Sequence, residues 1–296
     1  MVDINYTPYD SPEYKVFSYW RDQAKRGELK TIPCIAGWSD ICGSGRLLDK
    51  AHWSLQAAQD LDLFRALSQK YLVLGRPLIT GVPPMPTERV LVINDGVART
   101  IDLTDPAYIH QAHILFYVRD LLMYHYMLER QLVGYGLGLR TVLAGGQRCQ
   151  YSPNSSTGQS LLYYTNEPSA FGKALLNQCF VNNPAEFQMN TAFALAYTLE
   201  SLGTEKGIIP NRVYIEESWL EKLNAFMPEP SLLEQHEIHF MWQGEPGITI
   251  AFDDRREFLE KGFSFNVFRI QDFIVHKRFE GEMTEFPMSQ HDRYHL

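Results

Sequence analysis

Hydrophobic and polar positions follow two different periods along this chain, and each change of period marks a predicted element. A nearly continuous apolar run over residues 31–42 predicts a buried strand. Apolar residues at helical spacing over residues 47–71 predict the helices that follow it. Two β-like runs over residues 89–103 flank an Asn-Asp-Gly sequence at 94–96, which is a strong hairpin signal. Before these elements, a short leading helix is expected within residues 1–30.

The second half of the chain continues the same alternation of patterns. A long helix is expected from Pro106 to about residue 133, where a cluster of glycines ends it. The segments after it predict strands at 139–146 and 173–182, a helix at 184–197, a helix at 218–226, and strands at 237–242, 248–252 and 263–274. No repeat or linker divides the chain. We therefore expect one domain over residues 1–296, with a leading helix (1–30), a core (31–210) and a C-terminal α/β extension (211–296).

The charge and hydropathy of the chain exclude some classes of binding partner. The 296 residues carry a formal charge of −8 without a block of like charges. No basic segment offers the electrostatic footprint that nucleic-acid binding requires. The start has no secretory pattern, and no apolar run is long enough to cross a bilayer. We therefore expect a soluble cytoplasmic protein that uses neither nucleic acid nor a membrane as a partner.

Two aspartates stand where apolar runs end. Asp40 closes the first strand, and Asp95 is in the hairpin turn. If the first strand lies beside the hairpin, their carboxylates converge and can hold hard divalent cations together with substrate phosphates. Residues 42–45, at the start of a helix, add amides and a helix dipole suited to the same phosphates. The alternative is that Asp40 is a cap or turn residue and Asp95 an ordinary turn residue.

These residues carry a family resemblance. SDICGSGRL at 39–47 is similar to the first metal-binding motif of class III nucleotidyl cyclases, and INDGV at 93–97 resembles their hairpin motif, with Asn94 where glycine is usual. EFQMNTAF at 186–193 resembles a later helix of that family. The resemblance covers roughly residues 32–203. It implies an α+β, ferredoxin-like palm fold, with a mixed, mostly antiparallel sheet, helices on one face, and extra C-terminal strands.

A narrower resemblance follows from LGLRTV at 137–142 taken with the later helix. Together they resemble the pyrimidine cyclases of Pycsar antiphage systems. That resemblance implies a homodimer making cyclic UMP or cyclic CMP, which activates a separate effector protein. It implies two Mg²⁺ or Mn²⁺ ions per site, held by Asp40, Asp95 and the backbone carbonyl of Ile41. Asn190 would come from the other subunit and orient the ribose.

The chain lacks one arginine that is characteristic of purine cyclases, so other arginines are candidates for phosphate binding. Where those enzymes have an arginine four residues after the asparagine, this chain has Ala194. Arg148 is a candidate catalytic phosphate clamp, because a guanidinium grips phosphate with two hydrogen bonds. Its alternative is a solvent-facing arginine. Arg46, together with Cys42, Gly43 and Ser44, is expected to contribute to substrate binding.

Two positions bear on the choice of base. Leu91 stands where purine cyclases read the base with lysine or glutamate, and it cannot make that contact. Asn183 stands at the second base-reading position, where its amide can face either pyrimidine, although it can also simply cap a helix. The loss of both purine-reading residues favours a pyrimidine without choosing between uracil and cytosine. Our prediction is conversion of UTP to cyclic UMP and pyrophosphate. The alternatives are CTP as substrate, or a non-catalytic nucleotide-binding module of the same fold.

Overall fold

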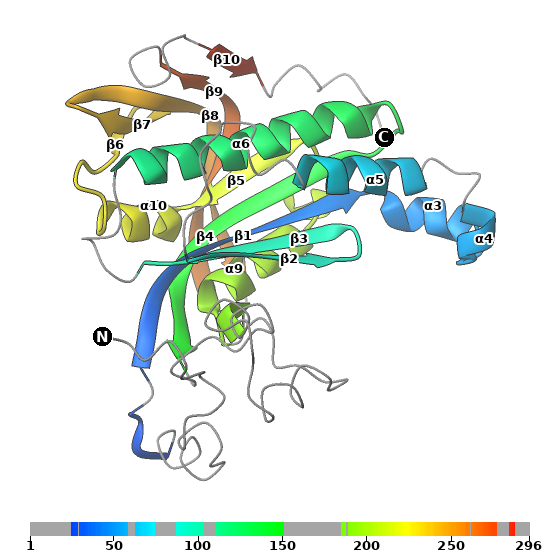
Figure 1. Ribbon diagram of the computed structural model, residues 1–296, viewed down its shortest axis with the longest axis horizontal. Helices are drawn as coiled ribbons and strands as arrows, with labels where there is room; N and C mark the ends of the chain where they lie inside the picture. Colours follow the sequence, from blue (N-terminus) through cyan, green and yellow to red (C-terminus); the bar gives the residue numbers. More distant parts are fainter. Residues whose placement is uncertain are drawn as a thin grey trace, which may run out of the picture. The chain divides into compact units, whose positions relative to one another are not determined.

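Figure 1 shows the computed structural model, which describes residues 25–28, 30–58, 63–74, 87–103, 111–150, 185–187, 189–260, 262–276 and 284–287. The chain forms two compact units. The larger unit comprises Cys34–Gly146 and Ala192–Leu296, and the smaller comprises Met1–Pro33 and Gln147–Thr191. The single domain expected over residues 1–296 stays a prediction.

Most described elements agree with the hydrophobic pattern. The strands are β1 (Lys30–Cys42), β2 (Glu88–Ile93), β3 (Gly96–Asp102), β4 (Gly138–Gln150), β5 (Arg212–Glu216), β6 (Leu232–Glu234), β7 (Glu237–Trp242), β8 (Glu245–Glu260), β9 (Phe263–Val275) and β10 (Thr284–Pro287). The helices are α3 (Ser44–Lys50), α4 (Leu55–Ala58), α5 (Leu63–Leu74), α6 (Gln111–Val133), α9 (Thr191–Ser201) and α10 (Glu217–Asn224), with short 3₁₀ helices η3 (Ala185–Phe187) and η4 (Thr204–Lys206). The first strand, the hairpin, the end of the long helix and the C-terminal strands are confirmed.

The described strands form one sheet. Their order is β2-β3-β1-β4-β5-β9-β8-β7-β6, and β10 pairs with β9. β4 and β5 run parallel, whereas β3 runs antiparallel to both β1 and β2. The pairs from β5 through β9 to β6, and β10 with β9, are also antiparallel. The predicted α+β class with a mixed, mostly antiparallel sheet is confirmed. The more specific class III cyclase fold stays a prediction.

The main hydrophobic core lies between α6 and the sheet. Ile35 of β1, Leu143 of β4 and Val118 of α6 belong to the same buried cluster, and α6 crosses the strands in Figure 1. The apolar positions of α6 recur every three or four residues, so one side of the helix can be buried along its whole length. Burial of this stripe against the strands fixes the position of the sheet's central region.

A second helix covers the opposite face of the sheet. Cys34 and Ala36 of β1 pack against Ala192 and Phe193 of α9. Successive residues of a strand face opposite sides, so these two residues face away from Ile35 and α6. The expectation that helices lie on one face is therefore wrong for α9, whose small apolar residues permit close approach to the sheet. Asp40 follows Cys34 and Ala36 at even spacing, so it shares the α9 face.

The helix predicted over residues 184–197 is interrupted. In the smaller unit, η3 ends at Phe187, and α9 begins four residues later at Thr191. Met189 has φ +48°, a left-handed conformation that a right-handed helix cannot contain. Asn190 forms an isolated antiparallel bridge with Arg148. The predicted strand at 173–182, Asn183, and most of the leading helix lie outside the described residues.

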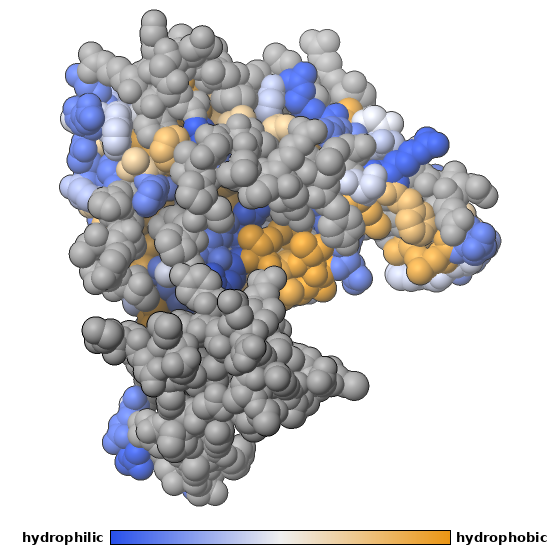
Figure 2. All heavy atoms as spheres, in the orientation of Figure 1, coloured by the Kyte–Doolittle hydropathy of each residue, from blue (hydrophilic) through white to orange (hydrophobic). Residues whose placement is uncertain are grey.

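β2 forms one edge of the sheet, and β6 stands at the other end of the strand order. Val90 and Ile93 on β2 are each 45% exposed, and Figure 2 shows apolar surface over the β2–β3 hairpin. Exposed apolar side chains gathered on one edge mark a surface suited to contact with another molecule. As for membranes, no helix among the described residues combines the length and apolar character needed to cross one.

Candidate active site

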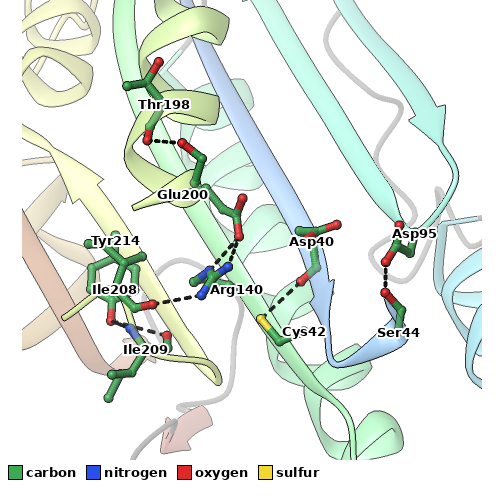
Figure 3. A network of polar contacts seen from close by, with 11 residues as sticks. Asp40, Cys42, Ser44, Asp95, Arg140, Thr198, Glu200, Ile208, Ile209 and Tyr214 are labelled. Atoms are coloured by element: carbon green, nitrogen blue, oxygen red, sulfur yellow. Dashed lines mark hydrogen bonds and ion pairs between the residues drawn. The ribbon is translucent and has the colours of Figure 1, made fainter. Parts of the chain in front are cut away.

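Asp40 and Asp95 lie at the same end of neighbouring strands. Asp40 is near the end of β1, and Asp95 is in the turn between β2 and β3. In the antiparallel register of β1 with β3, Asp40 is opposite Gly96, the residue directly after Asp95. Figure 3 shows the two carboxylates at this end of the sheet. The predicted placement on adjacent strands is therefore confirmed, whereas metal binding by these residues stays a prediction.

The shape of the turn explains the local sequence. Asn94 has φ +51°, a conformation that asparagine tolerates better than most residues. A Cβ atom on Gly96 would lie 2.2 Å from the Trp38 ring. That ring is held in turn by edge contacts with Phe193 and Tyr197, at centroid distances of 5.9 and 5.5 Å. Glycine is thus required at residue 96 because an aromatic ring of β1 packs directly on the chain.

We expect Gly96→Ala to lower the free energy of unfolding by about 1–3 kcal/mol, because the new methyl group must displace the Trp38 ring. Gly45→Ala is the matched control, since nothing lies within 4 Å of its added Cβ in α3, and alanine favours a helix. Urea unfolding followed by circular dichroism measures both variants. Equal stability of the two variants would contradict the packing argument.

Ser44 ties the first motif to the hairpin. Its hydroxyl donates a hydrogen bond to the Asp95 carboxylate. Gly43 has φ +93° and directs the chain from β1 into α3, which starts at Ser44. The hydroxyl of Ser44 therefore orients Asp95, and substrate binding through the backbone amide of Ser44 stays a prediction. Because α3 has seven residues, its dipole is small, and the charges of the predicted nucleotide substrate would have to be met mainly by ions and side-chain cations.

Lys70 of α5 reaches the same turn. It is 1% exposed, and its Nζ donates to the backbone carbonyls of Asn94 at 2.5 Å and Gly96 at 3.4 Å. Burial lowers the pKa of Lys70 to about 8, while the charges of Asp95 and Asp40 act in the opposite direction. The residues on both sides of Asp95 are therefore held by one buried cation.

The electrostatic surroundings of Asp40 disfavour its charged form. Burial, followed by the charges of Asp95 and Glu200, raises the pKa of Asp40 to about 7. Arg140 and Lys70 act in the opposite direction but do not cancel this rise. Without a bound cation, a large fraction of Asp40 is thus protonated at neutral pH. A divalent ion between the carboxylates would add a positive charge that favours the ionised form of Asp40.

Arg140 is the arginine that acts electrostatically on Asp40. It forms an ion pair with Glu200 of α9, with Nε 2.6 Å from Oε1, and donates to the carbonyl of Ile208 at 3.0 Å. Both Arg140 and Glu200 point into the network drawn in Figure 3. A guanidinium in this position can donate hydrogen bonds to a phosphate oxygen in place of part of its contact with Glu200.

The donor set fits a hard cation. Asp40 and Asp95 provide oxygen ligands, and burial, followed by the charge of Asp95, destabilises the charged form of Asp40 when no ion is bound. Among the described residues, no group of three or more His, Cys, Asp and Glu side chains is arranged to hold a metal ion. The Ile41 carbonyl, water and nucleotide phosphates would have to complete the coordination. Magnesium sites typically have this composition, with one or two carboxylates and substrate oxygens.

Other residues expected to bind substrate have different positions. The Cys42 thiol lies 4.0 Å from the backbone carbonyl oxygen of Asp40, and burial raises its pKa to about 12, so it stays a thiol. Arg46 is exposed and donates to the carbonyl of Gly136 at 3.2 Å. Leu91 is half-buried in β2. Their roles toward a nucleotide stay predictions.

The remaining predicted residues belong to the smaller unit. Asn190 is 4% exposed, and its Nδ2 donates to the carbonyl of Glu186 at 2.9 Å. Arg148 is 6% exposed, so the alternative of a solvent-facing arginine is wrong. In the larger unit, Ala194 is exposed in the first turn of α9. No side chain at that position supplies the charge that purine cyclases have there.

Sequence reasoning did not identify Lys70 and Arg140. A signal for Lys70 exists, because it stands four residues after the buried Ala66 on α5 and therefore on its buried side. Arg140 stands between Leu139 and Thr141, both buried, on the strand after the long helix. Lys70 and Arg140 thus share one feature, which is a positively charged residue at a position that the sequence pattern predicts to be buried.

Comparisons with known proteins gave no relatives: no protein-family model and no curated protein matches the chain.

Proposed function

We propose that this protein is a metal-dependent nucleotidyl cyclase that converts UTP to cyclic UMP and pyrophosphate, with CTP as the alternative substrate. The observation that carries the proposal is the register of β1 with β3, which places Asp40 opposite the residue after Asp95. The raised pKa of Asp40, caused by burial and by Asp95, supports it because a cation is the missing counter-charge. The cyclase class itself comes from the sequence resemblance.

Each residue of the candidate site has a separate role in the proposed reaction. Asp40 and Asp95 would hold the ions, while the Ser44 hydroxyl keeps the Asp95 carboxylate oriented. Divalent ions, when bound, lower the pKa of the ribose 3′-hydroxyl and neutralise the triphosphate. Arg140 would meet a phosphate oxygen from the α9 face, where purine cyclases use the arginine that Ala194 replaces. Asn190 would orient the ribose, as the resemblance implies.

A pyrimidine base is favoured because the chain lacks a polar side chain that could read a purine. Leu91 is apolar and lies half-buried in β2, so it cannot donate to or accept from a purine edge. Asn183 retains the donor and acceptor that a pyrimidine needs. Uracil and cytosine differ at this edge in the group on C4, which is a carbonyl or an amine, and in N3, which is a donor or an acceptor. The substrate assay below separates them.

The proposal includes assembly and signalling. A homodimer would let Asn190 of one subunit complete the site of the other. The exposed Val90 and Ile93 beside the aspartate turn support contact at this edge. The cyclic nucleotide would act on a separate effector, as in the antiphage systems that the sequence resembles.

The test uses the purified full chain with each of the four nucleoside triphosphates and Mn²⁺. We expect cyclic UMP and pyrophosphate from UTP, identified by mass spectrometry. Cyclic CMP from CTP would keep the cyclase proposal and change the substrate. Nucleotide binding without turnover would replace the enzyme by a binding module, and neither binding nor turnover would contradict both.

A further inference from the structure

Lys70 is an unusual residue for its position in α5. It is 1% exposed, and no other lysine is among the buried side chains in the described part of the chain. A buried ammonium group loses its hydration, so it persists only where neighbouring groups compensate for that loss. The neighbours of Lys70 therefore indicate what the charge does.

Two backbone carbonyls contact this ammonium group, and they belong to the residues before and after Asp95. Nζ is 2.5 Å from the Asn94 oxygen and 3.4 Å from the Gly96 oxygen. These carbonyls are neutral, so they satisfy the hydrogen-bond donors without balancing the charge. The opposite charges that act on Lys70 are those of Asp95 and Asp40. Lys70 is thus tied to the turn by hydrogen bonds and to both carboxylates by charge.

The location of Asp95 makes this arrangement important. Asp95 lies in a turn, where Asn94 is exposed and adopts φ +51°. Ser44 fixes the carboxylate from one side, and Lys70 fixes the backbone from α5. Without a cation near the turn, the charges of Asp40 and Asp95 would repel each other across the end of β1 and β3.

We propose that Lys70 is a resident counter-cation and positioning residue, which holds the Asp95 turn in place and offsets part of the negative charge of both aspartates until a divalent ion binds. The proposal rests on the metal site of the proposed function. Lys70 acts through Asp95 and its turn, and it touches neither substrate nor reacting atoms. A divalent ion, once bound, takes over much of the charge balance and is repelled by the lysine that remains.

Two consequences follow from this exchange of charges. Removal of the Lys70 charge should lower the melting temperature of the metal-free protein, because the carboxylates lose their counter-charge. The same change should increase the affinity for Mn²⁺ by about tenfold, because the site becomes more negative by one charge. A lysine that served only to pack α5 would give the first effect without the second.

The experiment measures the melting temperature of each variant at increasing Mn²⁺ concentrations. The rise in melting temperature with Mn²⁺ gives the dissociation constant of the variant for this ion. The variants are Lys70→Met, which removes charge and donor, and Lys70→Gln, which keeps a donor and removes the charge. Lys222→Met on α10 is the control for loss of a positive charge elsewhere. We expect both Lys70 variants to bind Mn²⁺ about tenfold more tightly, and the control to bind like the wild type.

Each other outcome has a defined meaning. If Lys70→Gln binds Mn²⁺ like the wild type, the charge has no role and the proposal is overturned. If both Lys70 variants fold only when Mn²⁺ is present, replacement of one cation by another is supported directly, whereas failure to fold in either condition overturns it. If Mn²⁺ stabilises neither the wild type nor any variant, the metal site of the proposed function fails instead.

Discussion

Asp40→Asn is expected to abolish turnover and, at the same time, to stabilise the metal-free protein. The amide keeps the size of the side chain but removes the charge that would bind a divalent ion. Loss of that ligand should lower kcat/KM by at least about 10³-fold. Asp95→Asn should have a similar effect on turnover, while its amide oxygen can still accept the hydrogen bond from Ser44.

The stability effect of Asp40→Asn has a defined pH range. The pKa of Asp40 rises from 3.8 to about 7 on folding, chiefly through burial. Between these two values the folded state binds the proton more tightly, so stability falls as the pH increases from about 4 to about 7. Asparagine removes this loss. We expect a gain of about 2 kcal/mol at pH 8, which allows for the remaining solvent contact, and no gain below pH 4.

Urea unfolding at pH 4 and pH 8, with chelator present, measures the gain, and the rate of cyclic nucleotide formation measures turnover. Asp49→Asn is the control, because Asp49 is an exposed carboxylate on the neighbouring helix α3. It should change neither quantity. Full activity of Asp40→Asn would disprove the metal assignment, and equal stability of this variant and the wild type at pH 8 would contradict the electrostatic account.

Replacement of the Arg140–Glu200 pair is expected to lower turnover by about 10²-fold, because a cation that meets developing phosphate charge is lost. Both residues are changed together, as Arg140→Met/Glu200→Met. Removal of Arg140 alone would leave the Glu200 carboxylate buried without its guanidinium, at a cost of about 3–5 kcal/mol. The double variant separates loss of catalysis from loss of folding.

The control for this prediction is a second arginine pair in the same sheet. Arg269 of β9 contacts Asp253 of β8 through Nε at 2.7 Å and through a second nitrogen at 3.0 Å. Arg269→Met/Asp253→Met should therefore keep normal turnover. Single-turnover kinetics with UTP compares the two double variants. Unchanged turnover in Arg140→Met/Glu200→Met would remove Arg140 from the proposed mechanism.

The hydrophobic pattern predicted much of the fold where a local period continues over many residues. The apolar run at 31–42 became β1, and the Asn-Asp-Gly sequence became the β2–β3 turn. The prediction was wrong at residues 184–197, where good helix formers continue through Met189. Met189 has φ +48°, and the next residue, Asn190, forms a bridge with Arg148, which is 42 positions away. Helix propensity contains no information about such a contact.

In the candidate site, too, local sequence predicted some residues, whereas contacts between distant residues decided others. Asp40 and Asp95 could be selected because a carboxylate that ends an apolar strand is visible in a short window of sequence. Arg140 and Glu200 are 60 positions apart, and Lys70 is 24 positions from the Asn94 carbonyl. Each stands in an apolar context that predicts burial without naming a partner. Charges that meet through packing of separate elements are therefore missed by any local pattern.

The sequence by itself determined the strand that has Asp40 near its end and the turn that contains Asp95, because strand period and turn chemistry depend on neighbouring residues. It left the convergence of the two aspartates conditional on which strands pair. The tertiary structure decided that condition through the register of β1 with β3. It also placed Lys70 and Arg140 around the carboxylates, because burial of apolar faces on α5, β4 and α9 sets where their charged side chains lie.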